Sequence, residues 1–155
     1  VRPLSSRSLA EFWNRYYYYF KEVLVDFFFY PAFRRWFKQH PRLRIAFATF
    51  CAAGFGNFLY HLIFASHVFA SGTPWAELDR FVTLAFYVSV LSAGLIISQL
   101  YGRNTSPQDG IWRHEIWPRL KVALFFCLLK VFDSVWLQGD LGDRFVFFFG
   151  LFGVS

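Results

Sequence analysis

The first segment of the chain, from Ser8 to Tyr30, mixes polar and apolar positions with the period of an α-helix. Ser8 followed three residues later by Glu11 matches a capping box, which marks a helix start. At about 100° per residue the polar side chains share one face, and they are Glu11, Asn14, Arg15, Tyr18, Lys21, Glu22 and Asp26. We predict an amphipathic or re-entrant helix over 8–30 that ends at Pro31. It either lies in the membrane interface or turns its polar face toward a protein-lined, watery cavity.

Three longer apolar runs follow, over residues 45–70, 81–101 and 120–137. A membrane-spanning helix needs about 20 predominantly apolar residues. Each run therefore predicts a transmembrane helix, with polar or turn-forming segments between them. The apolar run 145–154 is shorter than a membrane span, and we interpret it as the beginning of a truncated fourth span. The expected fold is an all-α, polytopic membrane protein, in which the amphipathic helix precedes these spans.

The composition supports a membrane protein. Hydrophobic residues make up 56% of the 155 residues and charged residues 17%, whereas soluble domains average about 25% charged residues. A soluble chain of this kind would expose large apolar patches, and a disordered one would leave them solvated. The chain begins at Val1 and contains no Met. We expect residues 1–155 to be a single membrane-embedded fragment of a longer chain.

The net charge of +6 is spread between the apolar runs, a pattern that favours membrane topology over nucleic-acid binding. Residues 31–44 carry five basic and no acidic side chains, and 102–121 carry four basic and two acidic ones. Residues 71–80 and 138–144 each carry one more acidic than basic side chain. The positive-inside rule then predicts that 31–44 and 102–119 face the cytoplasm. An integral protein of the plasma or inner membrane, or of the endoplasmic reticulum, is expected.

His61 is the candidate for chemistry, because an ionisable group near the middle of a span is expensive and is by default functional. Asn57 lies one turn before it, and Gly54 about one turn earlier again. The simpler alternative is a neutral histidine that hydrogen-bonds Asn57 or a neighbouring helix. No cluster has the spacing of a metal site, and Cys51 and Cys127 lie within apolar runs as small packing residues.

The segment Phe12-Trp13-Asn14-Arg15, the acidic–aromatic pair Asp26-Phe27 and Leu59-Tyr60-His61 together resemble the membrane-bound O-acyltransferase family. The likeness covers residues 8–70, and this chain would correspond to a diverged C-terminal portion. Three positions depart from the family pattern. Tyr16 replaces a second tryptophan, Tyr17 stands at a His or Asn position, and Leu62 replaces a glycine.

This resemblance implies an enzyme that transfers an acyl group from a thioester to a hydroxyl of a saccharide, lipid or protein. It implies that His61 is the general base, with support from Asn57, Asn14 and Tyr17. Arg15 and Trp13 would contact the donor. No cofactor would be bound, because an acyl thioester such as acyl-CoA or an acyl carrier is a co-substrate. The partners would be the lipid bilayer, the acyl donor and the hydroxyl acceptor.

A second hypothesis is a non-catalytic membrane subunit for transport or scaffolding. Lys130 and Asp133 lie three residues apart within the third apolar run, so they share one face of a helix. Such a pair neutralises itself within a bilayer, or couples ions in a transporter.

Overall fold

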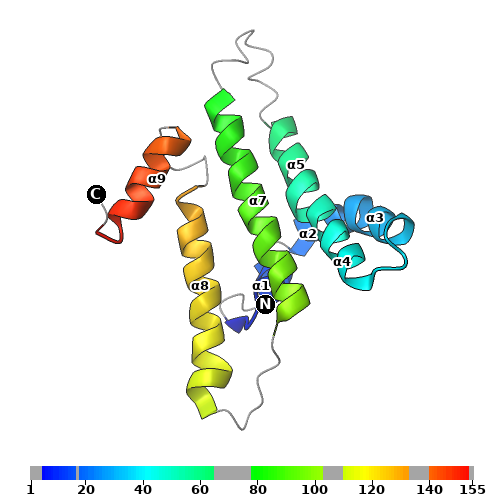
Figure 1. Ribbon diagram of the computed structural model, residues 1–155, viewed down its shortest axis with the longest axis horizontal. Coiled ribbons are helices and arrows are strands. Elements are labelled where there is room, and N and C mark those ends of the chain that lie inside the picture. Colours follow the sequence, from blue (N-terminus) through cyan, green and yellow to red (C-terminus); the bar gives the residue numbers. More distant parts are fainter. Residues whose placement is uncertain (1–4, 17, 65–77, 103–109, 133–139, 154–155) are drawn as a thin grey trace.

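The computed structural model describes residues 5–16, 18–64, 78–102, 110–132 and 140–153 (Figure 1). Within these ranges the regular structure is helical and contains no strand, so the all-α expectation is confirmed. Two long helical rods form the centre. One is built from α4 (Pro41–Thr49), η3 (Phe50–Gly56) and α5 (Asn57–Phe64), and the other is α7 (Leu78–Tyr101). They run antiparallel side by side, and α8 lies on the other side of α7 (Figure 1).

The N-terminal segment forms α1 (Leu9–Tyr16), α2 (Tyr18–Leu24), the π-helical turn η2 (Val25–Phe29) and α3 (Tyr30–Arg35). The predicted cap is present, because the Glu11 backbone N–H donates to Ser8 Oγ at 3.1 Å. The predicted end at Pro31 is wrong, since the helix continues to Arg35. In η2 the Tyr30 N–H donates to the Val25 carbonyl, five residues back. This wider turn, placed directly before α3, lets Pro31 enter a helix despite having no N–H.

The basic connector predicted over 31–44 is mostly helical as well. Residues 36–40 alone separate α3 from α4, and Pro41 occupies the first turn of α4, where its missing N–H costs little. The Arg44 guanidinium lies 3.8 Å from the centre of the Phe33 ring and donates to the Phe33 carbonyl. This contact joins α3 to α4, and the helix predicted as the first span begins at Pro41 instead of residue 45. Residues 65–70 of the predicted span lie outside the described residues.

The helix predicted over 81–101 is present as α7, which ends at Tyr101 as expected and begins three residues early, at Leu78. The helix predicted as the third span begins much earlier than residue 120, because the π-helical turn η6 (Trp112–Ile116) leads directly into α8 (Trp117–Lys130). Again the turn precedes a proline, Pro118, and the Trp117 N–H donates to the Trp112 carbonyl. The predicted polar loop 102–119 is therefore partly helical. Residues 133–137 lie outside the described residues.

The last helix, α9 (Leu141–Gly150), begins four residues before the predicted fourth apolar run. A capping box explains the early start, because Asp140 accepts from the Asp143 N–H at 2.8 Å and Asp143 accepts from the Asp140 N–H at 3.3 Å. The helix gives way to a turn at 151–153. Ten residues extend only about 15 Å, so α9 as described is too short to span a bilayer.

The core lies where the N-terminal helices meet the two rods. Its buried residues are Trp13, Leu24, Ala52, Ala53, Leu91, Leu95 and Leu129. Glycines allow the helices to pack this closely. A Cβ placed on Gly56 would lie 2.8 Å from Phe28 Cδ2, and one placed on Gly94 would lie 2.5 Å from Phe125 Cζ. Among the described helices, two are long and apolar enough to cross a membrane, Pro41–Phe64 and Phe81–Tyr101. The helix expected as a third span, α8, is not one of them.

Candidate functional site

His61 is half-buried on α5, and its ring meets the Tyr60 ring edge-on at 5.7 Å between centres. It lies 17 residues after Arg44, about 25 Å along the helix. Thr49 bonds Gln99 on the antiparallel α7, and counting from that pair places His61 level with Tyr87, about 9 Å from Phe81 at the start of the α7 apolar run. By this count His61 lies nearer to the Leu78 end of α7 than to its Tyr101 end.

Asn57 is buried, with 2% of its surface exposed, at the junction of η3 and α5. The π-helical turn η3 precedes it and packs against α7 and against η2. The small side chains of this turn (Ala52, Ala53, Gly54 and Gly56) are buried too. The predicted stripe of small and polar residues thus lies against other helices, as a packing face does.

The motif residues on α1 point in different directions. Trp13 is buried in the core, and Asn14 is exposed. Arg15 forms an ion pair with Glu11 and donates to Ser5 Oγ at 2.6 Å. Any anionic ligand of Arg15 would have to compete with Glu11. Tyr17, the fourth residue that the resemblance singles out, lies outside the described residues.

The motif helices nevertheless reach the turn that carries His61. The Phe20 ring of α2 packs on the Tyr60 ring of α5 with 4.4 Å between centres, and Tyr60 precedes His61 directly. Tyr60 also packs on Phe64 at 4.6 Å. The aromatic cluster fixes α2 against α5. On the exposed side of α2, a hydrogen bond to the Glu22 carboxylate and the charge of that group raise the pKa of Tyr18.

A small cavity of about 190 Å³ lies between α1, α2, η2 and the two central rods. Trp13 and Asn14 line it, together with Lys21, Thr49 and Gln99 and apolar side chains from the surrounding helices. Thr49 Oγ1 donates to Gln99 Oε1 at 2.7 Å, which leaves the Gln99 amide N–H groups as donors. The cavity begins at the level of Ala53, eight residues before His61, or about 12 Å along the axis. The cavity therefore contains two of the predicted residues but not His61.

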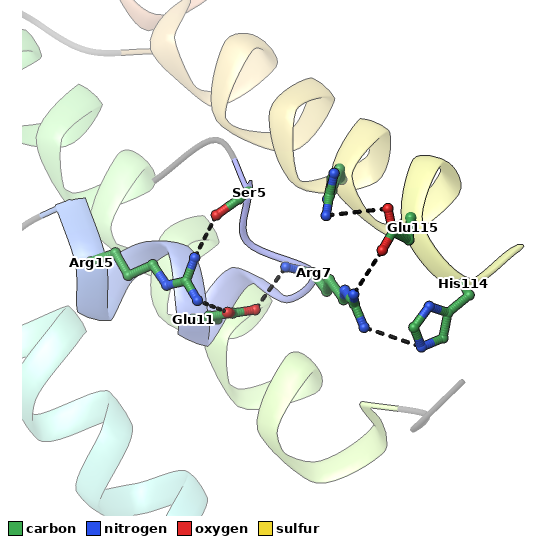
Figure 2. A network of polar contacts seen from close by, with 7 residues as sticks. Ser5, Arg7, Glu11, Arg15, His114 and Glu115 are labelled. Carbon is green, nitrogen blue, oxygen red and sulfur yellow. Dashed lines mark hydrogen bonds and ion pairs between the residues drawn. The ribbon is translucent and has the colours of Figure 1, made fainter. Parts of the chain in front are cut away.

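Polar side chains gather instead at the end of the bundle where α7 ends and η6 begins. Figure 2 shows this polar cluster, which consists of Ser5, Arg7, Glu11, Arg15, His114 and Glu115. Arg7 donates to Glu115 Oε1 at 3.1 Å, and Arg7 Nη1 lies 3.1 Å from His114 Nε2. Arg119 forms a second ion pair with Glu115 at 3.5 Å. Because arginine only donates, His114 Nε2 accepts in this contact.

A large cavity of about 980 Å³ opens beside the polar cluster. Its charged and polar lining includes Arg7, Ser8, Glu11, Ser98, Gln99 and Lys121, and its apolar and aromatic lining includes Leu9, Tyr101, Trp117, Val122 and Phe125. Gln99 lines both cavities. The sequence offered no sign of this site, because Arg7 and Glu115 are 108 residues apart.

The structure thus divides the described predicted residues among four places. His61 lies with Tyr60 and Phe20, Asn57 on the buried face, Trp13 with Asn14 at the small cavity, and Arg15 in the polar cluster. Of the alternative pair, Lys130 ends α8 and is exposed, and Asp133 lies outside the described residues. Within the described part of the chain, no three His, Cys, Asp or Glu side chains lie close enough to hold a metal ion.

Comparison with protein-family models, with curated proteins and with solved structures finds no match to this chain.

Proposed function

We propose that this chain is the C-terminal portion of a diverged membrane-bound O-acyltransferase. It transfers an acyl group from a thioester donor to a hydroxyl of a saccharide, lipid or protein. His61 is the general base, Asn57 and Asn14 are supporting polar groups, and the donor approaches Trp13 and Arg15. An anionic donor would exchange with Glu11 for the Arg15 guanidinium.

One observation supports this proposal more than the others. The segment that carries the family-like Phe12–Arg15 motif continues into α2, and α2 packs on the turn that carries the histidine through Phe20 and Tyr60 at 4.4 Å. A chance likeness spread over 50 residues of sequence would not require its two halves to touch. The contact joins the segment after the first half of the motif to the helix that carries the second half, which supports the proposal.

The chemistry requires a proton acceptor beside the attacking hydroxyl. His61 takes the hydroxyl proton as the oxygen bonds to the thioester carbonyl carbon. The carbon–sulfur bond then breaks, and the imidazolium returns the proton to the departing thiolate. Imidazole suits both steps because it exchanges protons near neutral pH. Amide N–H groups such as that of Asn57 can hold the ring or face the developing oxyanion.

The proposal includes a membrane setting. The rods Pro41–Phe64 and Phe81–Tyr101 cross the bilayer in opposite directions, and α8 follows as a third crossing that includes residues 133–137. Residues 31–44 and 102–119 then lie on the cytoplasmic side, in agreement with their excess of basic side chains. The amphipathic α1 and α2 rest against the rods, with Glu22 and Asp26 exposed on the polar side.

The test compares His61→Ala with the wild type in the full-length protein. Membranes from expressing cells are incubated with radiolabelled acetyl-CoA and, separately, palmitoyl-CoA, and hydroxylamine-labile label is measured in lipid, glycan and protein fractions. General-base catalysis contributes about 10²–10⁴-fold, so His61→Ala should lower acyl transfer by that factor. The KM for the thioester should change little, because the base acts on the acceptor.

His40→Ala is the matched control, since His40 is exposed in the short connection 36–40. It should transfer label at the wild-type rate. Normal turnover by His61→Ala, at equal expression, would remove His61 from catalysis. Absence of transfer by the wild type with both donors would favour the transport or scaffold subunit instead.

A further inference from the structure

The large cavity lies at one end of the helix bundle, where charged and apolar side chains from several helices meet. It lies at the end of the 21-residue apolar helix Phe81–Tyr101. An α-helix of that length extends about 30 Å, which equals the hydrocarbon thickness of a bilayer. In the proposed membrane setting the mouth of the cavity, beside Tyr101 and Gly102, therefore lies at the level of the lipid headgroups.

The charge around the cavity is positive. Arg7 and Lys121 line it with one acidic residue, Glu11. Adding the ion-pair partners of the cluster gives four basic side chains (Arg7, Arg15, Arg119 and Lys121) against two acidic ones (Glu11 and Glu115). Lys121 forms no ion pair within the described residues, and its ammonium group lies 5.2 Å from the centre of the Trp117 ring. An anion in the cavity would meet a surplus of positive charge.

The rest of the lining is apolar. Leu9, Val122 and Phe125 form a wall that leads away from the charged mouth. Phe125 packs so closely on α7 that a Cβ on Gly94 would lie 2.5 Å from its ring. Trp117 and Tyr101 are exposed at 53% and 71% beside the mouth, and such aromatic side chains concentrate at membrane interfaces. A free phosphate would make no use of this wall.

From these observations we propose that the large cavity binds one anionic phospholipid of the surrounding leaflet. Its phosphate lies near Lys121 and Arg7, and the first part of an acyl chain lies along Val122 and Phe125. A cavity of about 980 Å³ holds a drug-sized group, which corresponds to the headgroup and the upper chain of a lipid. The inference rests on the proposed membrane setting and is independent of acyl transfer.

The experiment uses the full-length protein in nanodiscs that contain phosphatidylglycerol and phosphatidylcholine in equal amounts. Native mass spectrometry after release from the nanodisc measures the lipid that stays bound. We expect retained phosphatidylglycerol in the wild type. Lys121→Gln should weaken its retention about fivefold, since one basic residue near a lipid surface contributes about 1 kcal/mol. Lys121→Arg should restore retention.

Two further variants distinguish lipid binding in the cavity from nonspecific electrostatic attraction of the lipid to basic side chains. Lys38→Gln removes one exposed basic side chain from the connection 36–40 and should leave retention unchanged. Ser98→Phe keeps the charge but adds a ring to the cavity lining, and it should lower retention as much as Lys121→Gln. Size-exclusion profiles and thermal melting confirm that each variant is folded.

Three results would overturn the proposal. Equal losses in Lys38→Gln and Lys121→Gln would show diffuse attraction to the basic end of the bundle. Full retention by Ser98→Phe would place the lipid outside the cavity. Release of the lipid by millimolar inorganic phosphate, with phosphate bound in its place, would identify a soluble phosphate ligand. Because retention is measured without any thioester, failure of the lipid proposal and failure of acyl transfer are separate results.

Discussion

The turn around His61 and the polar cluster around Arg7 are opposite in nearly every respect. His61 is half-buried within an apolar stretch of helix, and its ring meets Tyr60, which packs on Phe20. The polar cluster contains arginines, glutamates and a histidine from segments 108 residues apart. The first region can be noticed in the sequence because it interrupts a hydrophobic run. The second exists only once the N-terminal segment with α1 and the turn η6 come together.

This contrast separates two kinds of polar residue in an apolar protein. A buried or half-buried polar group within a span is conspicuous in the sequence, and it serves packing as readily as chemistry. Polar groups at the ends of helices are inconspicuous in the sequence, although a cavity with charged walls can form there. The two regions therefore call for different tests.

The largest expected effect is a difference in labelling between loops on opposite sides of the membrane. Single cysteines at Lys38, Ser71, Ser106 and Gly139 are introduced after Cys51 and Cys127 are replaced by alanine. An impermeant maleimide added to intact cells should label positions 71 and 139 and leave 38 and 106 unlabelled until the membrane is opened. Labelling of 71 and 106 from the same side would disprove the three-span arrangement.

A loss of stability of intermediate size is expected when the glycines at the close helix contacts are replaced by alanine. Gly56→Ala would place a methyl group 2.8 Å from Phe28, and Gly94→Ala would place one 2.5 Å from Phe125. Overpacking of this kind costs about 1–3 kcal/mol. Gly56→Ala should also lower acyl transfer, because it displaces the motif helices from the His61 helix, while Gly94→Ala should affect lipid retention.

The matched control is Gly150→Ala, since an added Cβ at Gly150 meets no atom within 4 Å. Thermal melting in detergent measures all three variants. Equal melting temperatures for Gly56→Ala, Gly94→Ala and Gly150→Ala would mean that the close approaches at η3 and α7 are not required for packing.

The smallest expected effect concerns the polar cluster itself. Glu115→Gln removes the ion pairs with Arg7 and Arg119, whose side chains are 41% and 38% exposed. Exposed pairs contribute about 0.2–1 kcal/mol, and salt screens them. The melting temperature should fall slightly at low ionic strength and match the wild type in high salt. Asp26→Asn, on the exposed side of η2, is the control. A loss that persists in high salt would contradict the screened-pair interpretation.

Much of the fold could be predicted from the apolar runs. The span 81–101 agrees with α7 to within three residues, and the Ser8–Glu11 cap is present. Three of the boundary errors share a cause, because prolines were interpreted as helix ends or loop residues. Pro31, Pro41 and Pro118 each occupy the first turn of a helix. Local sequence does not distinguish a proline that breaks a helix from one that begins a helix on the far side of a π-helical turn.

The candidate site was less predictable. The motif around Trp13 and Asn14 was found from its sequence, but its residues line a cavity about 12 Å or more from His61 along the helix axis. Hydropathy and motif spacing contain no information on how α1 docks across the rods. Lys21, Thr49 and Gln99, which complete the small cavity, carry no sequence signal of their own.

Two of the π-helical turns in the described residues, η2 and η6, have a consequence for hydration. Val25–Phe29 and Trp112–Ile116 each end two residues before a proline, at Pro31 and Pro118. Each proline removes one N–H from the helical ladder, so a carbonyl in the preceding turn has to find its partner elsewhere. Hydrocarbon offers no donor. In the proposed membrane setting, these two turns would therefore need water, headgroups or neighbouring side chains beside them, and could not lie against lipid chains alone.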